Sequence, residues 1–145
     1  MRTLLLLRHA KSDYPAGVPD HDRPLNERGR RDAPVAGRWL TAHAPALDLV
    51  LVSSARRAQQ TWQLASADLD VPGVVRTEPR VYEASVSILL NVVRSIPETV
   101  QSALLVGHNP GLEELAELMA NDGEPSASRA ISVKYPTSEI GRAHV

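Results

Sequence analysis

The chain has 145 residues, of which 43% are hydrophobic and 23% charged, and this is the composition of one ordinary globular domain. It contains no cysteine, which excludes disulfides, thiol catalysis and cysteine-ligated zinc. The net charge of −1 gives no reason to expect nucleic acid as a partner, and no apolar run approaches the roughly 20 residues of a membrane-spanning helix. We therefore expect a cytoplasmic protein that binds neither nucleic acid nor a membrane.

The first segment that carries chemistry is residues 4–12, with the sequence LLLLRHAKS. Four consecutive leucines are typical of a parallel strand that is buried on both faces. The strand ends on Arg8 and His9, at the carboxyl end where α/β sheets bind their ligands. An arginine beside a histidine combines an anion-binding group with a nucleophile or base. On this segment alone, a polar turn with a surface histidine is an equal alternative.

The rest of the chain alternates between helices and strands. Apolar residues at helical spacing predict four helices, at residues 25–44, 55–69, 86–96 and 110–119. Residues that can accept hydrogen bonds from a first helical turn lie at their starts, namely Asn26, Ser54, Ser85 and Asn109. Pro34 lies inside the first helix, where a proline can introduce a kink.

Short apolar runs predict three further strands, at residues 46–52, 102–106 and 131–135, with a short extended segment at residues 74–80. Residues 13–24 contain three prolines and form a loop over the carboxyl edge of the sheet. Strands that alternate with helices at this spacing predict a three-layer α/β/α domain with a mostly parallel central sheet.

Polar residues follow three of the predicted strands. The first strand ends in Arg8 and His9, the second is followed by residues 53–57 (SSARR), and the third by residues 107–109 (GHN). Two histidines and at least two arginines therefore meet at one edge of the sheet. A chance occurrence of all these residues at one edge is much less expected than that of any one of them. The convergence therefore predicts a site for an anionic ligand.

These segments resemble the histidine phosphatase superfamily, whose hallmarks are an Arg-His pair after the first strand, an Arg-Ala-x-x-Thr segment and a later Gly-His. The chain has RHA at residues 8–10, RAQQT at residues 57–61 and GHNP at residues 107–110. Smaller motifs resemble its compact SixA-type branch of phosphohistidine phosphatases, namely RHAKS, DRPLNERG, VYEAS and VGHNPG. The resemblance covers residues 1 to about 138 and implies a phosphoglycerate-mutase-like fold.

The resemblance implies that His9 is the nucleophile and forms a phosphohistidine intermediate. Arg8, Arg57 and His108 then supply donors for the phosphoryl oxygens, and their positive charge favours a neutral His9. Arg57 begins the Arg-Ala-x-x-Thr segment, so Arg56 is expected at the surface. We expect neither a metal ion nor a cofactor in this reaction.

Three further residues are candidates for the site. Ser12 either binds phosphate or shapes its turn, and Arg23 either binds the anion or pairs with Asp20 or Asp22. Glu83 either serves as a general acid or caps the next helix and faces solvent.

Four other residues are expected to have structural or surface roles and no direct part in the chemistry. Thr61 is expected to have a packing or supporting role, and Ala10 replaces a common glycine, which matters if the turn needs a positive φ. His21 and His43 have no motif support and are expected at the surface.

The favoured function is a metal-independent phosphatase that removes phosphate from protein phosphohistidine, for example on a histidine-phosphotransfer domain. One alternative is a small-molecule phosphomonoesterase or a phosphoglycerate-mutase-like enzyme, although such members usually carry longer insertions. Another is a phosphate-binding regulatory module without turnover.

The last residues of the chain lack a core pattern. Residues 140–145, IGRAHV, resemble the translation of a sequencing-library adapter fused to a truncated reading frame. We expect a histidine phosphatase domain at residues 1–138, incomplete at its C-terminus, and a non-native tail at residues 139–145. His144 is given no role.

Overall fold

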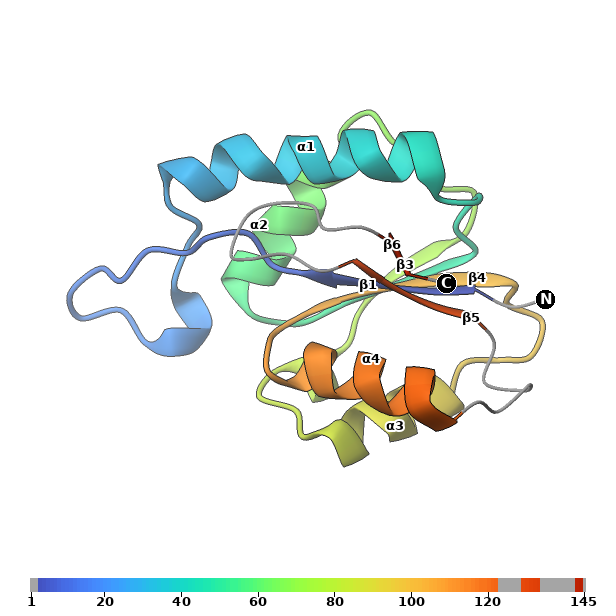
Figure 1. Cartoon of the computed structure of the whole chain (residues 1–145). Helices are drawn as coiled ribbons and strands as arrows, with labels where there is room; N and C mark the ends of the chain where they lie inside the picture. The colour runs from blue at the N-terminus through green and yellow to red at the C-terminus, as the bar shows by residue number, and fades with distance from the viewer. Residues whose placement is uncertain (1–2, 123–128, 134–142, 145) are drawn as a thin grey trace.

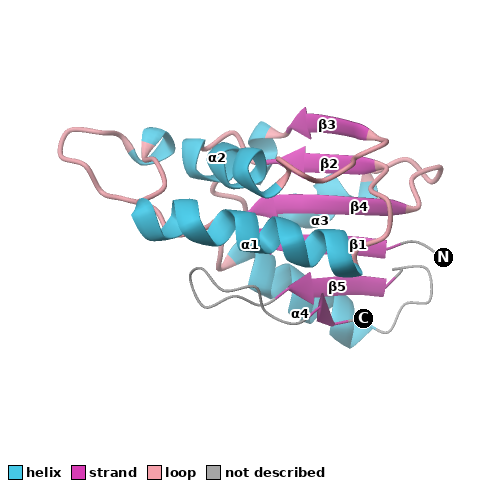
Figure 2. Ribbon diagram, turned by 90° about the horizontal axis from the view of Figure 1, so that it is seen from above, coloured by secondary structure: helices cyan, strands magenta, loops and turns pink. Residues whose placement is uncertain are grey.

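A computed structural model describes residues 3–122, 129–133 and 143–144, which form a sheet with helices on both faces (Figure 1). Within these residues the strands pair in the order β3-β2-β4-β1-β5-β6 (Figure 2). Their bounds are β1 Thr3–Arg8, β2 Leu49–Val52, β3 Val74–Thr77, β4 Ser102–Gly107, β5 Arg129–Val133 and β6 Ala143–His144. The first five run parallel and β6 runs antiparallel to β5, so the mostly parallel sheet is confirmed.

Two helices cover each face of the sheet. Helices α1 (Glu27–His43) and α2 (Arg56–Ala65) lie on one face, and α3 (Val86–Arg94) and α4 (Gly111–Asp122) lie on the other (Figure 1). Among the described residues, none of the helices has the length and apolar character needed to cross a membrane.

The run of four leucines in β1 is explained by this layering. Leu5 and Leu7 belong to the core beneath α1 and α2, whereas Leu4 and Leu6 belong to the core beneath α3 and α4. Successive side chains of a strand point to opposite faces, so a strand covered on both sides is apolar at every position. The three-layer prediction is confirmed.

Of the four predicted helix starts, two are confirmed and two are wrong, since α4 begins at Gly111 and is preceded by Pro110 and not by Asn109. The Asn26 side chain accepts a hydrogen bond from the Gly29 amide at 2.8 Å, and Ser85 accepts one from Ile88 at 3.3 Å. Ser54 does not cap α2, because Ala55 occupies the N-cap position and makes no side-chain cap bond.

Several predicted boundaries differ from those of the structure. Helix α2 ends at Ala65 and not near residue 69, and α4 begins at Gly111, one residue after Pro110. Pro34 is accommodated inside α1. The extended segment expected at residues 74–80 is a strand only over Val74–Thr77, and Pro79–Val81 form a short 3₁₀ turn.

The C-terminal predictions fall partly outside the described residues. The expected strand at residues 131–135 is observed as β5, and Tyr135 is outside the described part of the chain. Of the expected tail at residues 139–145, Ala143 and His144 are described as β6, which pairs with Val133 and Ser132. The division of the chain at residue 138 remains a prediction.

The first turn of α1 packs directly on the segment that follows β1. A Cβ atom on Gly29 would lie 2.1 Å from the carbonyl oxygen of Lys11, far inside contact distance. The same carbonyl accepts a hydrogen bond from the Asn26 amide at 3.0 Å. The start of α1 therefore fixes the backbone two residues beyond His9.

We expect Gly29→Ala to lower the free energy of unfolding by about 2 kcal/mol, because the new methyl group collides with the Lys11 backbone. In a helix without such a contact the same change raises stability by about 1 kcal/mol, so a loss of stability indicates the contact and a gain indicates its absence. Urea denaturation measures the effect, and Arg31→Ala at a nearby exposed position serves as the control. A stabilised Gly29→Ala variant would contradict the close packing.

Candidate active site

Three adjacent strands end at the same edge of the sheet. Arg8 at the end of β1 is the register partner of Gly107 in β4, and Val52 at the end of β2 is the partner of Val106. The pairing continues past the strands, since the His9 amide donates to the Gly107 carbonyl at 2.9 Å. Residues that follow these three strands are thereby brought together.

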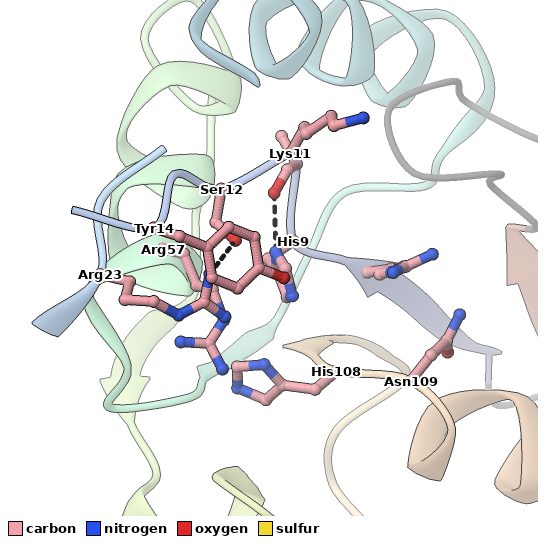
Figure 3. Close-up of a pocket in the computed structure, with 10 residues that line it drawn as sticks. His9, Lys11, Ser12, Tyr14, Arg23, Arg57, His108 and Asn109 are labelled. Carbon is pink, nitrogen blue, oxygen red and sulfur yellow. Dashed lines mark hydrogen bonds between the residues drawn. The ribbon is translucent and has the colours of Figure 1, made fainter. Parts of the chain in front are cut away.

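A pocket of about 260 Å³ lies at this edge (Figure 3). Its lining residues come from the segment after β1, from Arg23, from α2 and from the segment after β4. They are Arg8, His9, Ala10, Lys11, Ser12, Tyr14, Arg23, Arg57, His108 and Asn109. All the candidates except Glu83 are therefore present. In Figure 3 the rings of His9 and His108 lie near the guanidinium groups, whereas Lys11 extends away from His9.

The orientation of His9 is fixed by one backbone hydrogen bond. Its Nδ1 lies 2.7 Å from the Ala10 carbonyl oxygen, which can only accept, so Nδ1 carries the proton. In the neutral ring Nε2 then keeps its lone pair. Ala10 itself is buried and is not among the positive-φ residues of the described chain, so the turn does not need a glycine here.

His9 is held neutral at physiological pH. Its pKa is lowered to about 4, mainly by burial; the Ala10 hydrogen bond raises the pKa, and the positive charges of Arg57, Arg8 and Arg23 lower it. The family resemblance predicts that nearby cations keep His9 neutral. They do contribute, but burial is the larger cause.

His108 is the second imidazole of the site, with its ring centroid 5.1 Å from that of His9. Its Nε2 lies 2.7 Å from Oγ of Ser53, which also accepts a hydrogen bond from the Ala55 amide at 3.3 Å. The Ser53 hydroxyl can therefore donate to Nε2, which leaves the proton of the neutral ring on Nδ1. That atom is buried without a hydrogen-bond partner among the described residues.

The pKa of His108 is also strongly lowered, to about 3. Burial is the largest cause, followed by His9 and Arg57. His108 is therefore a neutral hydrogen-bond donor at pH 7.

Arg57 is a buried arginine with its two terminal nitrogens on one partner. Nη1 donates to the Asp20 carbonyl oxygen at 2.7 Å, and Nη2 donates to the Asp20 carboxylate at 3.1 Å. Nε of Arg57 and Nε of Arg8 are buried and have no partner within the described part of the chain. Buried donors are usually satisfied, so unpaired donors concentrated at one pocket are typical of a site that binds an anion. As expected, Arg56 is exposed.

Arg23 and Ser12 act together at the pocket wall. Nη1 of Arg23 donates to Oγ of Ser12 at 2.9 Å, and Nε donates to the Asp20 carboxylate at 3.0 Å. The guanidinium group also lies 4.0 Å from the ring centre of Tyr14. Both interpretations of Arg23 are therefore compatible, because it lines the pocket and pairs with Asp20.

Thr61 supports the site without lining the pocket. Its hydroxyl accepts a hydrogen bond from the Ala10 amide at 2.9 Å and donates to the Arg57 carbonyl at 2.7 Å. One side chain thus connects the segment after His9 to the first turn of α2, which confirms the supporting role expected for Thr61.

Glu83 is not among the residues that line the pocket. Its side chain is exposed. Its φ of 54° gives it a left-handed backbone conformation, which no other non-glycine residue has in the described part of the chain. This conformation is strained for a residue with a side chain, and strained residues cluster at functional sites. Its effect on the site is indirect. The pKa of the neighbouring Tyr82 hydroxyl is raised mainly by burial, next by the hydrogen bond to Asp20, and then by the Glu83 carboxylate.

Sequence reasoning missed several residues of the site. Ser53 holds His108, and Tyr82 donates its hydroxyl to the Asp20 carboxylate at 2.5 Å. His21, expected at the surface, is partly buried against Ser54 and Tyr82, whereas His43 is exposed as expected. Tyr82 lies within the VYEAS motif, which was the available signal for its importance.

The family comparison agrees with this geometry. The model of the histidine phosphatase superfamily (branch 1) matches residues 4–118. The chain belongs to this superfamily. It is 44% identical over 136 residues to an uncharacterized protein of Mycobacterium tuberculosis, covering 92% of this chain and 84% of the relative.

Solved structures place the chain near the SixA proteins. A structure from Nakamurella multipartitia that carries the name SixA has a TM-score of 0.72 and 35% identity, over 88% of this chain and 74% of that one. The protein histidine phosphatase SixA complexed with tungstate has a TM-score of 0.69 and 25% identity, over 77% of this chain and 72% of that one. The expected SixA-type resemblance and the phosphoglycerate-mutase-like fold are confirmed.

The two buried histidines predict a pH-dependent stability. In the unfolded chain they take up protons near pH 6.5, whereas in the folded protein they do so at about 4 for His9 and about 3 for His108. As the pH falls from 7 to 5 the unfolded state binds more protons, so the folded state loses stability. We expect a loss of about 1–2 kcal/mol per histidine, measured as the free energy of unfolding at the two pH values.

This pH window lies above the ordinary pKa of carboxyl groups, so Asp20 and the other acids contribute little to the slope. His108→Gln is expected to remove about half of the dependence. His43→Gln, at an exposed helical position, is the matched control and leaves the slope unchanged. Equal slopes for the parent and His108→Gln would contradict the burial of a neutral imidazole.

Proposed function

We propose that this histidine phosphatase removes phosphate from protein phosphohistidine, without a metal ion, through a phosphohistidine intermediate on His9. The observation that carries the proposal is the state of His9. Its Nδ1 proton is held by the Ala10 carbonyl and its pKa is about 4, so Nε2 is an unprotonated nucleophile at neutral pH.

The first step transfers the phosphoryl group to His9. The Nε2 lone pair forms a P–N bond while the bond from phosphorus to the substrate imidazole breaks, and the leaving imidazole takes up a proton from solvent. His9 keeps its Nδ1 proton and becomes a positively charged phosphoimidazolium. In the second step a water oxygen attacks phosphorus and gives up a proton to solvent, while the P–Nε2 bond breaks and its electron pair returns to Nε2. Inorganic phosphate is released and His9 returns to its neutral state.

The equatorial oxygens of the phosphoryl group need hydrogen-bond donors in both steps. Arg8 and Arg57 supply guanidinium groups, and neutral His108 supplies an N–H group. Removing one such donor typically reduces the rate of an enzyme by about a hundredfold. The two guanidinium groups provide the positive charge that a metal ion provides in other phosphoryl-transfer enzymes, which supports a metal-independent mechanism.

The substrate class is inferred from the shape of the pocket and from the relatives. A pocket of about 260 Å³ is at the small end of ligand sites and has room for a phosphoryl group with part of an attached ring. The similarity to a protein histidine phosphatase supports a protein substrate, for which a histidine-phosphotransfer domain is our candidate.

We expect His9→Ala to abolish turnover and phosphoenzyme formation, because the other imidazole of the pocket, His108, has its Nε2 bound to the Ser53 hydroxyl at 2.7 Å. The assay uses a labelled phosphohistidine protein in the presence of EDTA and brief incubation. The parent protein forms an adduct that is labile in acid and stable in alkali. Equal labelling of His9→Ala would remove His9 from this role, and loss of parent activity in EDTA with recovery on added metal would overturn the metal-free mechanism.

We also expect kcat/KM for a phosphohistidine protein to exceed that for 3-phosphoglycerate by at least about a hundredfold, or roughly 2.7 kcal/mol. Imidazole is a good leaving group once protonated, and Glu83 lies outside the pocket lining, so Glu83→Gln should change the hydrolysis of either substrate by less than about twofold. Initial rates on both substrates check this. A preference for 3-phosphoglycerate would favour the mutase-like alternative.

A further inference from the structure

Asp20 is the carboxylate around which the cationic side of the site is arranged. It is the first residue of the 3₁₀ turn Asp20–Asp22 in the loop between β1 and α1. Its side chain pairs with Arg57 at 3.1 Å and with Arg23 at 3.0 Å, and its backbone carbonyl accepts a second bond from Arg57 at 2.7 Å. Two arginines of the pocket wall therefore depend on one residue.

Asp20 contacts these arginines from outside the pocket. It is not among the pocket-lining residues, whereas Arg23 and Arg57 both are. Both terminal nitrogens of Arg57 are bound to Asp20, by the carbonyl and the carboxylate, so the plane of the guanidinium group is fixed. Each terminal nitrogen of Arg57 keeps one further N–H that can donate to a phosphoryl group.

Tyr82 in turn fixes Asp20. Its hydroxyl donates to the same carboxylate oxygen that Arg57 contacts, at 2.5 Å. The Tyr82 ring packs edge-on against His21 at 4.7 Å and His108 at 5.7 Å between ring centroids. Tyr82 thus connects the loop that carries Asp20 to the strand end that carries His108.

Asp20 does not have the properties of a proton donor. The Tyr82 hydrogen bond, followed by those from Arg23 and Arg57, holds the pKa of this carboxyl far below its usual range. An ionised carboxylate cannot protonate a leaving group at neutral pH. Its remaining chemical role toward the site is to accept hydrogen bonds from the groups that bind the substrate.

We infer that Asp20 is a positioning residue for Arg57, with Tyr82 as its support, and that it acts on phosphoryl transfer through the orientation of that guanidinium group. The part of this inference that concerns turnover rests on the proposed function. The part that concerns the order of Arg57 does not, and the two parts are tested separately.

The turnover test is a double-mutant cycle on a histidine-phosphotransfer domain phosphorylated with phosphoramidate. A misplaced catalytic group commonly costs one to two orders of magnitude in rate, so we expect Asp20→Ala to lower kcat about tenfold. In an Arg57→Ala background the same change should alter kcat less than about twofold, because there is no guanidinium group left to position. An equal reduction in both backgrounds would show a general structural role and overturn the inference.

Two variants control for damage to the loop. Asp22→Ala removes another carboxylate of the same 3₁₀ turn. The described contact of that carboxylate is with His21 at 3.5 Å, so its loss should leave kcat unchanged. Asp20→Asn keeps an oxygen that can accept from Arg57 and Tyr82, and it should retain more activity than Asp20→Ala. An Asp22→Ala loss as large as that of Asp20→Ala would contradict the assignment to Asp20.

The second test follows Arg57 itself by NMR of its Nε–Hε group and does not require turnover. We expect an ordered Nε–Hε signal in the parent and in Asp22→Ala, a loss of order in Asp20→Ala and an intermediate effect in Tyr82→Phe. If the parent does not hydrolyse phosphohistidine, the proposed function fails while a loss of order in Asp20→Ala still supports the inference. An unchanged order in Asp20→Ala overturns it whatever the activity.

Discussion

The site depends on the register of three parallel strands. Arg8 lies opposite Gly107 and Val52 lies opposite Val106, so β1, β4 and β2 end at one level of the sheet. A slip of one residue would turn every strand side chain to the other face, and the two covered cores make such a slip costly. The burial of leucine, valine and isoleucine on both faces therefore determines, at a distance, where the two histidines stand.

The site meets two opposing electrostatic requirements. A phosphoryl group requires several positive donors, but a nucleophilic histidine must remain unprotonated beside them. Burial lowers the pKa of His9 and His108, and the neighbouring arginines reinforce the effect because their charge disfavours imidazolium. In the proposed mechanism the same arginines can therefore bind the anion and help to keep His9 unprotonated. Asp20 offsets part of their mutual repulsion from outside the pocket.

The sequence predicts those features of the site that are local to the strand ends. Arg8, His9 and His108 follow apolar strands directly, so their place at the carboxyl edge follows from the fold class. Contacts between loops are not local and could not be read in this way. Nothing in the order of residues says that Asp20 meets Tyr82, 62 positions later, or that Ser53 rather than Ser54 faces His108.

The lining of the pocket bears on the leaving group that the enzyme can expel. An alkoxide needs a proton donor, whereas an imidazole leaves readily once protonated. The described lining residues supply guanidinium, imidazole, hydroxyl and ammonium groups but no carboxyl group. Asp20, the carboxylate bound to Arg57, is kept ionised mainly by the hydroxyl of Tyr82, and Glu83 lies outside the lining. Such a pocket is better suited to breaking a P–N bond than an ester bond, which supports phosphohistidine over alkyl phosphates as the substrate.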